Sequence, residues 1–81
     1  MTELLLPITR NISELNTIIS GYHAEENEKA VRIRLLGGNS FWVPKRYINS
    51  RFSADGEIMQ EFSIETWILK KIGFNFSNFK L

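Results

Sequence analysis

The segment 29–43 constrains the fold of this chain more than any other part of its sequence. Apolar and polar residues alternate over 29–36, and this period of two, rich in β-branched residues, predicts a strand with one buried face. The two glycines and Asn39 that follow favour the positive φ angles of a tight hairpin turn. Residues 40–43 are then the returning strand, which ends at Pro44 because proline has no N–H to donate. The sequence therefore predicts a β-hairpin.

The register of this hairpin depends on which residues form the turn. With the two glycines as a two-residue turn, Ile33 would face Trp42 and Arg34 would face Phe41. A slip of one residue exchanges the faces of the returning strand, so the register stays open.

The region before the hairpin carries two overlapping patterns. Residues 17–23 are rich in β-formers and predict a strand, which a polar connection over 24–28 joins to the hairpin. A stripe of isoleucine and leucine at helical spacing, with a capping-box pattern, predicts a helical turn near 11–15. Whether residues 8–20 form helix or strand stays open.

After the hairpin, residues 46–52 fit a short strand or a turn, and residues 54–56 fit a loop. Charged and hydrophobic residues alternate over 57–62, which predicts another strand.

Ser63 has the character of a helix N-cap, and we expect a C-terminal helix to begin there. Glu65 is favourable in its first turn, and Gly73 is a stop signal. The apolar stripe of this helix consists of Ile64, Trp67, Ile68 and Ile72.

These elements predict an α+β fold, with a small curled antiparallel sheet of about four strands, barrel-like, capped by one short C-terminal helix. The 81 residues make a single domain, 1–81, with a core at about 15–74 and a Phe-rich tail at 75–81. The chain has no cysteine, so its apolar residues, 43% of the total, must stabilise it without a disulfide.

Three motifs of this sequence occur together in a known group of proteins. Residues 28–31 read E-K-A-V, residues 42–48 read W-V-P-K-R-Y-I, and residues 67–73 read W-I-L-K-K-I-G. The chain thereby resembles small proteins of bacteriophages, prophages and other mobile elements, over about 24–74. The resemblance implies a fold and a genetic setting but no chemistry. The chain departs from the group in its longer N-terminus, in the Arg46-Tyr47 pair and in its Phe-rich tail.

Candidate catalytic and metal-binding residues do not assemble into a site. His23 is the one histidine, too few for a structural zinc site, and we expect it at the surface. The glutamates of 25–28 lack the spacing and the glycine of a calcium loop. Segment 37–40 lacks the Lys-Ser/Thr of a phosphate-binding loop and leads into a strand. We therefore expect no enzyme, no metal and no cofactor.

Basic and aromatic side chains around the hairpin form the strongest functional signal. Such surfaces bind single-stranded nucleic acid, because rings stack on bases and cations follow the phosphates. The alternative is that Trp42 and Trp67 are core residues and the arginines only solvate an exposed face. The candidate ligand-binding residues are Arg32, Arg34, Phe41, Trp42, Lys45, Arg46 and Tyr47.

The tail offers a second candidate surface. Its phenylalanines, Phe74, Phe76 and Phe79, either fold back over the small sheet or form a contact with another chain, such as a homodimer partner.

Two functions follow from these features. The first is a non-enzymatic phage-type protein that binds single-stranded nucleic acid or a nucleotide through the basic-aromatic hairpin face. The second is a phage inhibitor that binds and blocks a host protein complex, as anti-defence proteins do. A net charge of +1 permits an anionic partner without requiring one. With no apolar run long enough for a membrane span, the expected location is the host bacterial cytoplasm.

Overall fold

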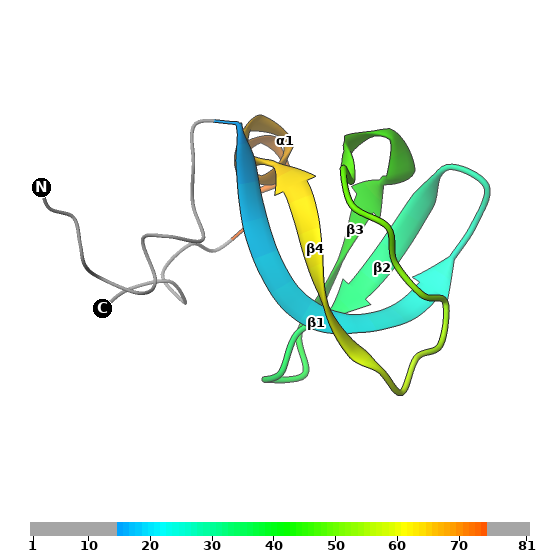
Figure 1. Ribbon diagram of the computed structural model, residues 1–81. Coiled ribbons are helices and arrows are strands. Elements are labelled where there is room, and N and C mark those ends of the chain that lie inside the picture. Colours follow the sequence, from blue (N-terminus) through cyan, green and yellow to red (C-terminus); the bar gives the residue numbers. More distant parts are fainter. Residues whose placement is uncertain (1–14, 75–81) are drawn as a thin grey trace, which may run out of the picture.

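A computed structural model describes residues 15–74 of the chain (Figure 1). Predictions that fall on residues 1–14 and 75–81 lie outside this described part, and of the helical turn predicted near 11–15 only Leu15 lies inside it. Its elements are β1 (Asn16–Glu26), β2 (Ala30–Arg34), β3 (Ser40–Pro44), the 3-10 turn η2 (Lys45–Tyr47), β4 (Met59–Glu65) and α1 (Thr66–Lys71). The α+β class is confirmed: four antiparallel strands are followed by one short helix.

The four strands form one sheet in the order β3-β2-β1-β4, with every neighbouring pair antiparallel. The sheet is open, and its two edges are β3 and β4. A single isolated bridge, between Ile48 and Ile64, links the segment after β3 to β4. The antiparallel sheet is therefore confirmed, whereas its curled, barrel-like form is not.

The two edges of the sheet differ in how they are covered. Residues 49–53 run along the β4 edge, where the Asn49 N–H donates to the Ser63 carbonyl (2.7 Å) and the Ser63 N–H to Ser50 Oγ (2.9 Å). On the β3 edge, the pairing with β2 directs the backbone groups of Ser40 and Trp42 outward. No backbone hydrogen bond from elsewhere in residues 15–74 meets those groups.

β1 is longer than predicted and reaches into the polar segment 24–28. Glu25 pairs with Arg32 and Glu26 with Val31, and a bulge between His23 and Glu25 shifts the register. The bulge accommodates one extra residue, so β1 stays paired with β2 in a segment that was predicted to be a polar connection.

The connection itself is a short turn over residues 27–29. The Asn27 side chain closes it, since its Oδ1 accepts hydrogen bonds from the backbone N–H groups of Lys29 and Ala30 (2.8 Å each). Asparagine stabilises turns in this way because its short side chain reaches backbone donors nearby in the sequence.

The hairpin is confirmed, and its register, which the sequence left open, follows from a turn longer than two residues. Ile33 pairs with Phe41 and Arg32 with Trp42, one residue away from the register that a Gly37-Gly38 turn would give. Of the two glycines only Gly38 has a positive φ, 97°, and its N–H donates to the Leu35 carbonyl (2.9 Å). The turn is therefore a three-residue loop with glycine in the left-handed position.

The second half of the chain departs from the prediction at the start of the helix. Ser63 is not an N-cap, because it lies inside β4, where it pairs with Ile18. Ile64 likewise belongs to the strand, and α1 begins at Thr66. The predicted end of the helix is confirmed by Gly73, whose φ is 82°. Residues 46–52, predicted as a strand or a turn, form part of η2 and an irregular segment.

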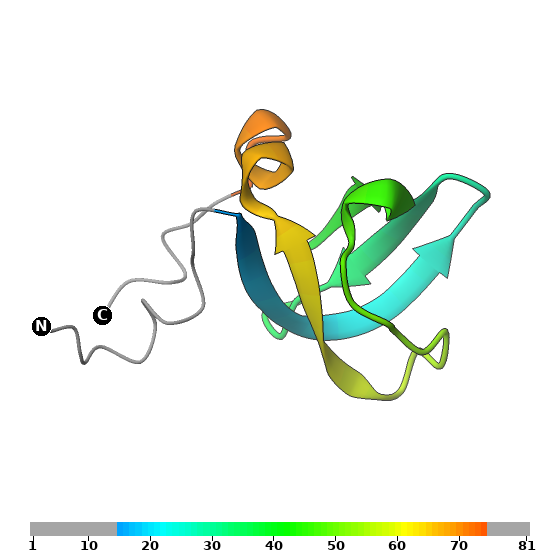
Figure 2. The same ribbon diagram turned by 45° about the horizontal axis from the view of Figure 1, so that its top comes forward.

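The core lies between one face of the sheet, here called the inner face, and α1, which follows directly from β4 at one end of the sheet (Figure 2). Its buried apolar side chains are Ile19, Val31, Ile33, Val43, Ile48, Phe62, Ile64, Ile68 and Leu69. One polar pair lies among them, since the buried hydroxyls of Thr17 and Thr66 are hydrogen-bonded at 2.8 Å. This pair ties β1 to the first turn of α1.

Candidate nucleic-acid interface

The opposite face of the sheet, here called the outer face, carries the candidate site. Because successive side chains of a strand point to opposite sides, burial of Val31 and Ile33 puts Arg32 and Arg34 on the outer face. Burial of Val43 puts Trp42 there as well, with 40% of its surface exposed. Three of the predicted ligand-binding residues are therefore brought together.

Two residues that the sequence analysis missed complete this surface. Tyr22 of β1 pairs with Arg34 on one side and with Met59 of β4 on the other. Met59 is 51% exposed. The positions of Tyr22 and Met59 on this surface depend on how β1 pairs with β2 and β4, which no local sequence pattern shows. We call Tyr22, Arg32, Arg34, Trp42 and Met59 the outer-face patch.

Close approach of β1 and β2 sets the place of Tyr22 on the patch. A Cβ atom at Gly21 would lie only 2.7 Å from the Arg34 carbonyl oxygen, so a residue without a side chain is needed there. Gly21 thereby lets β1 run close enough to β2 for the Tyr22 ring to meet the Arg34 side chain.

The two arginines of the patch differ in how they are held. Arg32 donates from Nε to Glu25 Oε1 (3.1 Å) and from a terminal nitrogen to Ser40 Oγ (2.9 Å), so its orientation is fixed. The exposed Arg34 guanidinium lies 4.5 Å from the centre of the Tyr22 ring, a cation–π contact. It has no ion pair within residues 15–74 and remains available to an anionic ligand.

Phe41 does not belong to the patch. The three-residue turn places it on the inner side, where its ring lies 5.0 Å from the ring of Phe74. Phe41 is half-buried there and so lies apart from the other predicted ligand-binding residues of the hairpin. Phe74 folds back against the sheet, as one of the two alternatives for the tail proposed, whereas Phe76 and Phe79 lie outside the described residues.

Lys45, Arg46 and Tyr47 form a separate group in η2, at the end of β3. The Lys45 ammonium pairs with Glu26 (2.5 Å), the Arg46 guanidinium lies 5.2 Å from the Tyr47 ring, and that ring meets Trp67 edge-on at 5.0 Å. Trp67 is 49% exposed, so its interpretation as a core residue is wrong.

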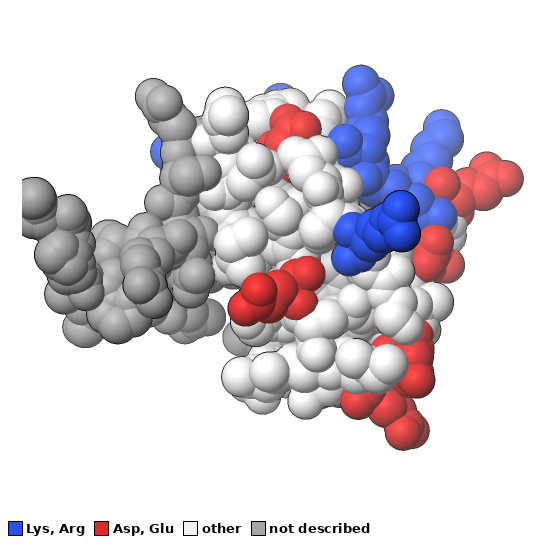
Figure 3. Space-filling model, viewed as in Figure 1, with Lys and Arg blue, Asp and Glu red and all other residues white. Residues whose placement is uncertain are grey.

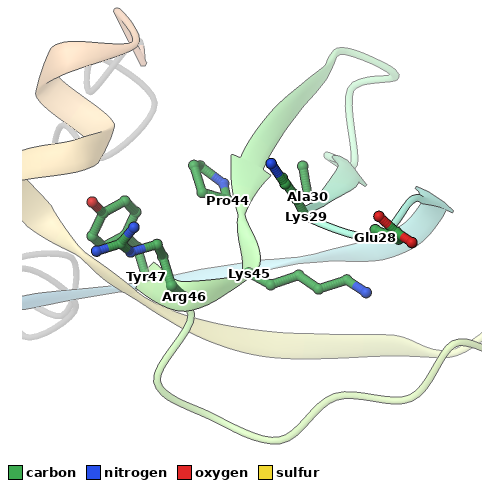
Figure 4. Close-up of a pocket in the computed structure, with 7 residues that line it drawn as sticks. All are labelled: Glu28, Lys29, Ala30, Pro44, Lys45, Arg46 and Tyr47. Carbon is green, nitrogen blue, oxygen red and sulfur yellow. The ribbon is translucent and has the colours of Figure 1, made fainter.

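A hollow of about 650 Å³ opens beside this group. We call it the η2 pocket, and it is lined by Glu28, Lys29, Ala30, Pro44, Lys45, Arg46 and Tyr47 (Figure 4). Most of the Lys and Arg surface visible in Figure 3 lies at this end of the molecule, near the β1–β2 turn and η2, with acidic side chains beside and below it.

His23 is buried, with 7% of its surface exposed, and its predicted surface position is wrong. The bulge after it lets its ring contact Glu26 three residues later, with Nε2 2.7 Å from Oε1, while the ring stacks on Phe52. Lys45, followed by His23, holds the pKa of the Glu26 carboxyl below its ordinary value through hydrogen bonds to the charged form. These three side chains form a polar link between β1 and η2.

Between residues 15 and 74, no three acidic or histidine side chains converge in a way that would hold a metal ion. No helical segment in the same range has the length and apolar content that crossing a bilayer demands. Comparisons with models of known protein families, with curated proteins and with solved structures find no match for this chain.

Proposed function

We propose that this chain is a non-catalytic protein that binds single-stranded nucleic acid on its outer-face patch. The observation that carries the proposal is the pairing of rings with cations on one solvent-exposed surface. Trp42 stands opposite Arg32, and Tyr22 stands opposite Arg34. Unpaired bases stack on exposed rings, and guanidinium groups contact the phosphates between them.

The layout of the patch suits one strand lying obliquely across the sheet. Trp42 is on β3 and Tyr22 is on β1, with both arginines on β2 between them. The Arg32–Trp42 pair and the Arg34–Tyr22 pair lie two residues apart along β2, a distance of about 7 Å. A ligand that stacks on both rings would therefore pass directly over the cations.

Charge on the outer face favours the same path. Glu61 and Glu65 occupy the β4 side of the sheet, and Glu25 partly neutralises Arg32. The unpaired positive charge is therefore concentrated at Arg34, which we expect to make the main phosphate contact.

Fluorescence anisotropy with a single-stranded oligonucleotide of about 12 nucleotides tests the proposal. We expect Arg34→Glu to weaken binding by about tenfold or more and to lower the salt dependence by about one phosphate contact. The matched control is Lys70→Glu, the same charge change on the exposed side of α1, which leaves the affinity unchanged. Equal binding by the wild type and Arg34→Glu would refute the proposal.

A protein partner is the second candidate function, as expected of a phage inhibitor of a host complex. The observation that favours it is the β3 edge, where the backbone groups of Ser40 and Trp42 point away from β2. An extended segment of a partner can add to such an edge as a further strand. Strand addition depends little on salt, so a host protein retained by both the wild type and Arg34→Glu at roughly 0.5 M salt would favour this function over the first.

A further inference from the structure

The η2 pocket continues the outer face beyond the patch. Ala30 pairs with Pro44, and this pair is the next outward-facing row after Arg32 and Trp42. Both residues line the pocket and project to the same side in Figure 4. A ligand that runs along β2 and β3 past Trp42 therefore reaches the pocket.

The surfaces of the pocket suit a flat ring. Ala30 and Pro44 give it a small apolar floor, and the ring of Tyr47 provides a wall toward α1. The edge-on contact with Trp67 fixes the orientation of that ring. A nucleobase has the flat, largely apolar face that stacks on such a floor or wall.

The cations of the pocket suit an anionic group next to that ring. Lys29 and Arg46 line it and have no ion pair within residues 15–74, whereas the Lys45 ammonium extends away from Ala30 and Pro44 and is held by Glu26. Glu28 is the one acidic side chain in the lining. Two available cations against one carboxylate favour an anion of more than one charge, such as a terminal phosphate.

We infer that the η2 pocket binds a nucleoside monophosphate group, with its base against Pro44 and Tyr47 and its phosphate between Lys29 and Arg46. The same chemistry has two sources, the phosphorylated end of a strand that crosses the outer face and a free mononucleotide. For the first source, the inference rests on the proposed function.

The test compares oligonucleotides of one sequence that end in a 5′-phosphate, a 3′-phosphate or no phosphate, with the fluorophore on the opposite end. We expect one terminal phosphate to raise the affinity of the wild type by about tenfold. In the double variant Lys29→Gln/Arg46→Gln that gain disappears, while the affinity for the unphosphorylated strand falls by less than about threefold. The control Lys70→Gln/Lys71→Gln, which removes two exposed charges from α1, keeps the gain.

Failure of the inference and failure of the proposed function give different results. If the wild type binds all three strands equally, the outer face binds nucleic acid and the pocket assignment is overturned. If it binds none of them, the proposed function fails, and titration with a free mononucleotide decides about the pocket. Binding of the mononucleotide that Lys29→Gln/Arg46→Gln abolishes supports the pocket as a nucleotide site, and no binding overturns it.

Discussion

The two faces of the sheet are built from the same strands and differ in almost every other respect. On the inner face, Phe62, Ile64 and Val31 are fully buried, and the buried polar side chains Thr17, Thr66 and His23 have hydrogen-bond partners. On the outer face, Trp42 and Met59 keep about half of their surface exposed, and within residues 15–74 the Arg34 guanidinium has a cation–π contact with Tyr22 and no ion pair. The inner face buries its apolar groups and pairs its buried polar ones, whereas the outer face keeps rings and a cation exposed to solvent.

This difference separates stability from binding. Substitutions on the inner face should change the free energy of unfolding, whereas substitutions on the outer face should change the affinity for a ligand. Two variants test this separation and a third tests the polar link between β1 and η2, and they are given from the largest expected effect to the smallest.

Phe62→Ala should have the largest effect, because it removes a fully buried ring that packs beside Phe52 in the core. We expect the free energy of unfolding to fall by about 3–5 kcal/mol, a large part of the stability of a domain of this size. Urea denaturation measures the change. Met59→Ala on the outer side of the same strand is the control and should cost less than about 1 kcal/mol. A similar loss for both variants would show that the two faces do not differ.

Trp42→Ala should affect binding more than stability. Loss of one stacking ring should weaken the affinity for a single-stranded oligonucleotide by about 1–3 kcal/mol, or roughly fivefold to 150-fold. Trp42→Phe keeps a ring and should retain most of the affinity. Anisotropy and urea denaturation of the same samples separate the two effects. A drop in stability larger than the drop in affinity would place Trp42 among the structural residues.

Glu26→Gln should have the smallest effect, and that effect should depend on pH. The pKa of Glu26 is lowered in the folded chain from its ordinary value of 4.5, chiefly by Lys45 and then by His23. Its carboxylate therefore stabilises the fold above that value, and the stabilisation is lost as the pH falls through the folded pKa.

Thermal unfolding at pH 7 and at about pH 3 measures this dependence. The Tm of Glu26→Gln should be lower than that of the wild type at pH 7, and the two should converge at the acidic pH. Glu28→Gln, which removes a nearby carboxylate that has no ion pair within residues 15–74, is the control and should show no such convergence. A difference in Tm that is the same at both pH values would contradict the role of the ion pair.

Local patterns predicted the hairpin, its two arginines on one face, and the end of the helix at Gly73. They failed where a contact between distant residues decides the structure. Ser63 is a good N-cap by its residue type, but pairing with Ile18 keeps it in the strand. The Gly37-Gly38 pair fits two turn types, and only the geometry of the hairpin selects one.

The candidate site was predicted in part for the same reason. Arg32 and Arg34 followed from the alternation of their strand, and the observed register brought Trp42 beside them. Tyr22 joins them through the pairing of β1 with β2, and Met59 through the pairing of β1 with β4. His23 was misplaced because its burial comes from alternation along β1, where it lies on the same side as Thr17 and Ile19, and not from its residue type.

The order of the strands has a consequence for how this chain folds. β2 and β3 are joined by only five residues, 35–39, whereas β1 pairs with β4 across a separation of nearly fifty residues at Asn16 and Glu65. Local pairs form quickly, and distant pairs must first bear the entropy of closing a long loop. We therefore expect the hairpin to form early and the closure of β1 on β4 to limit the folding rate. The Arg32–Trp42 pair would then assemble before the core that supports it is complete.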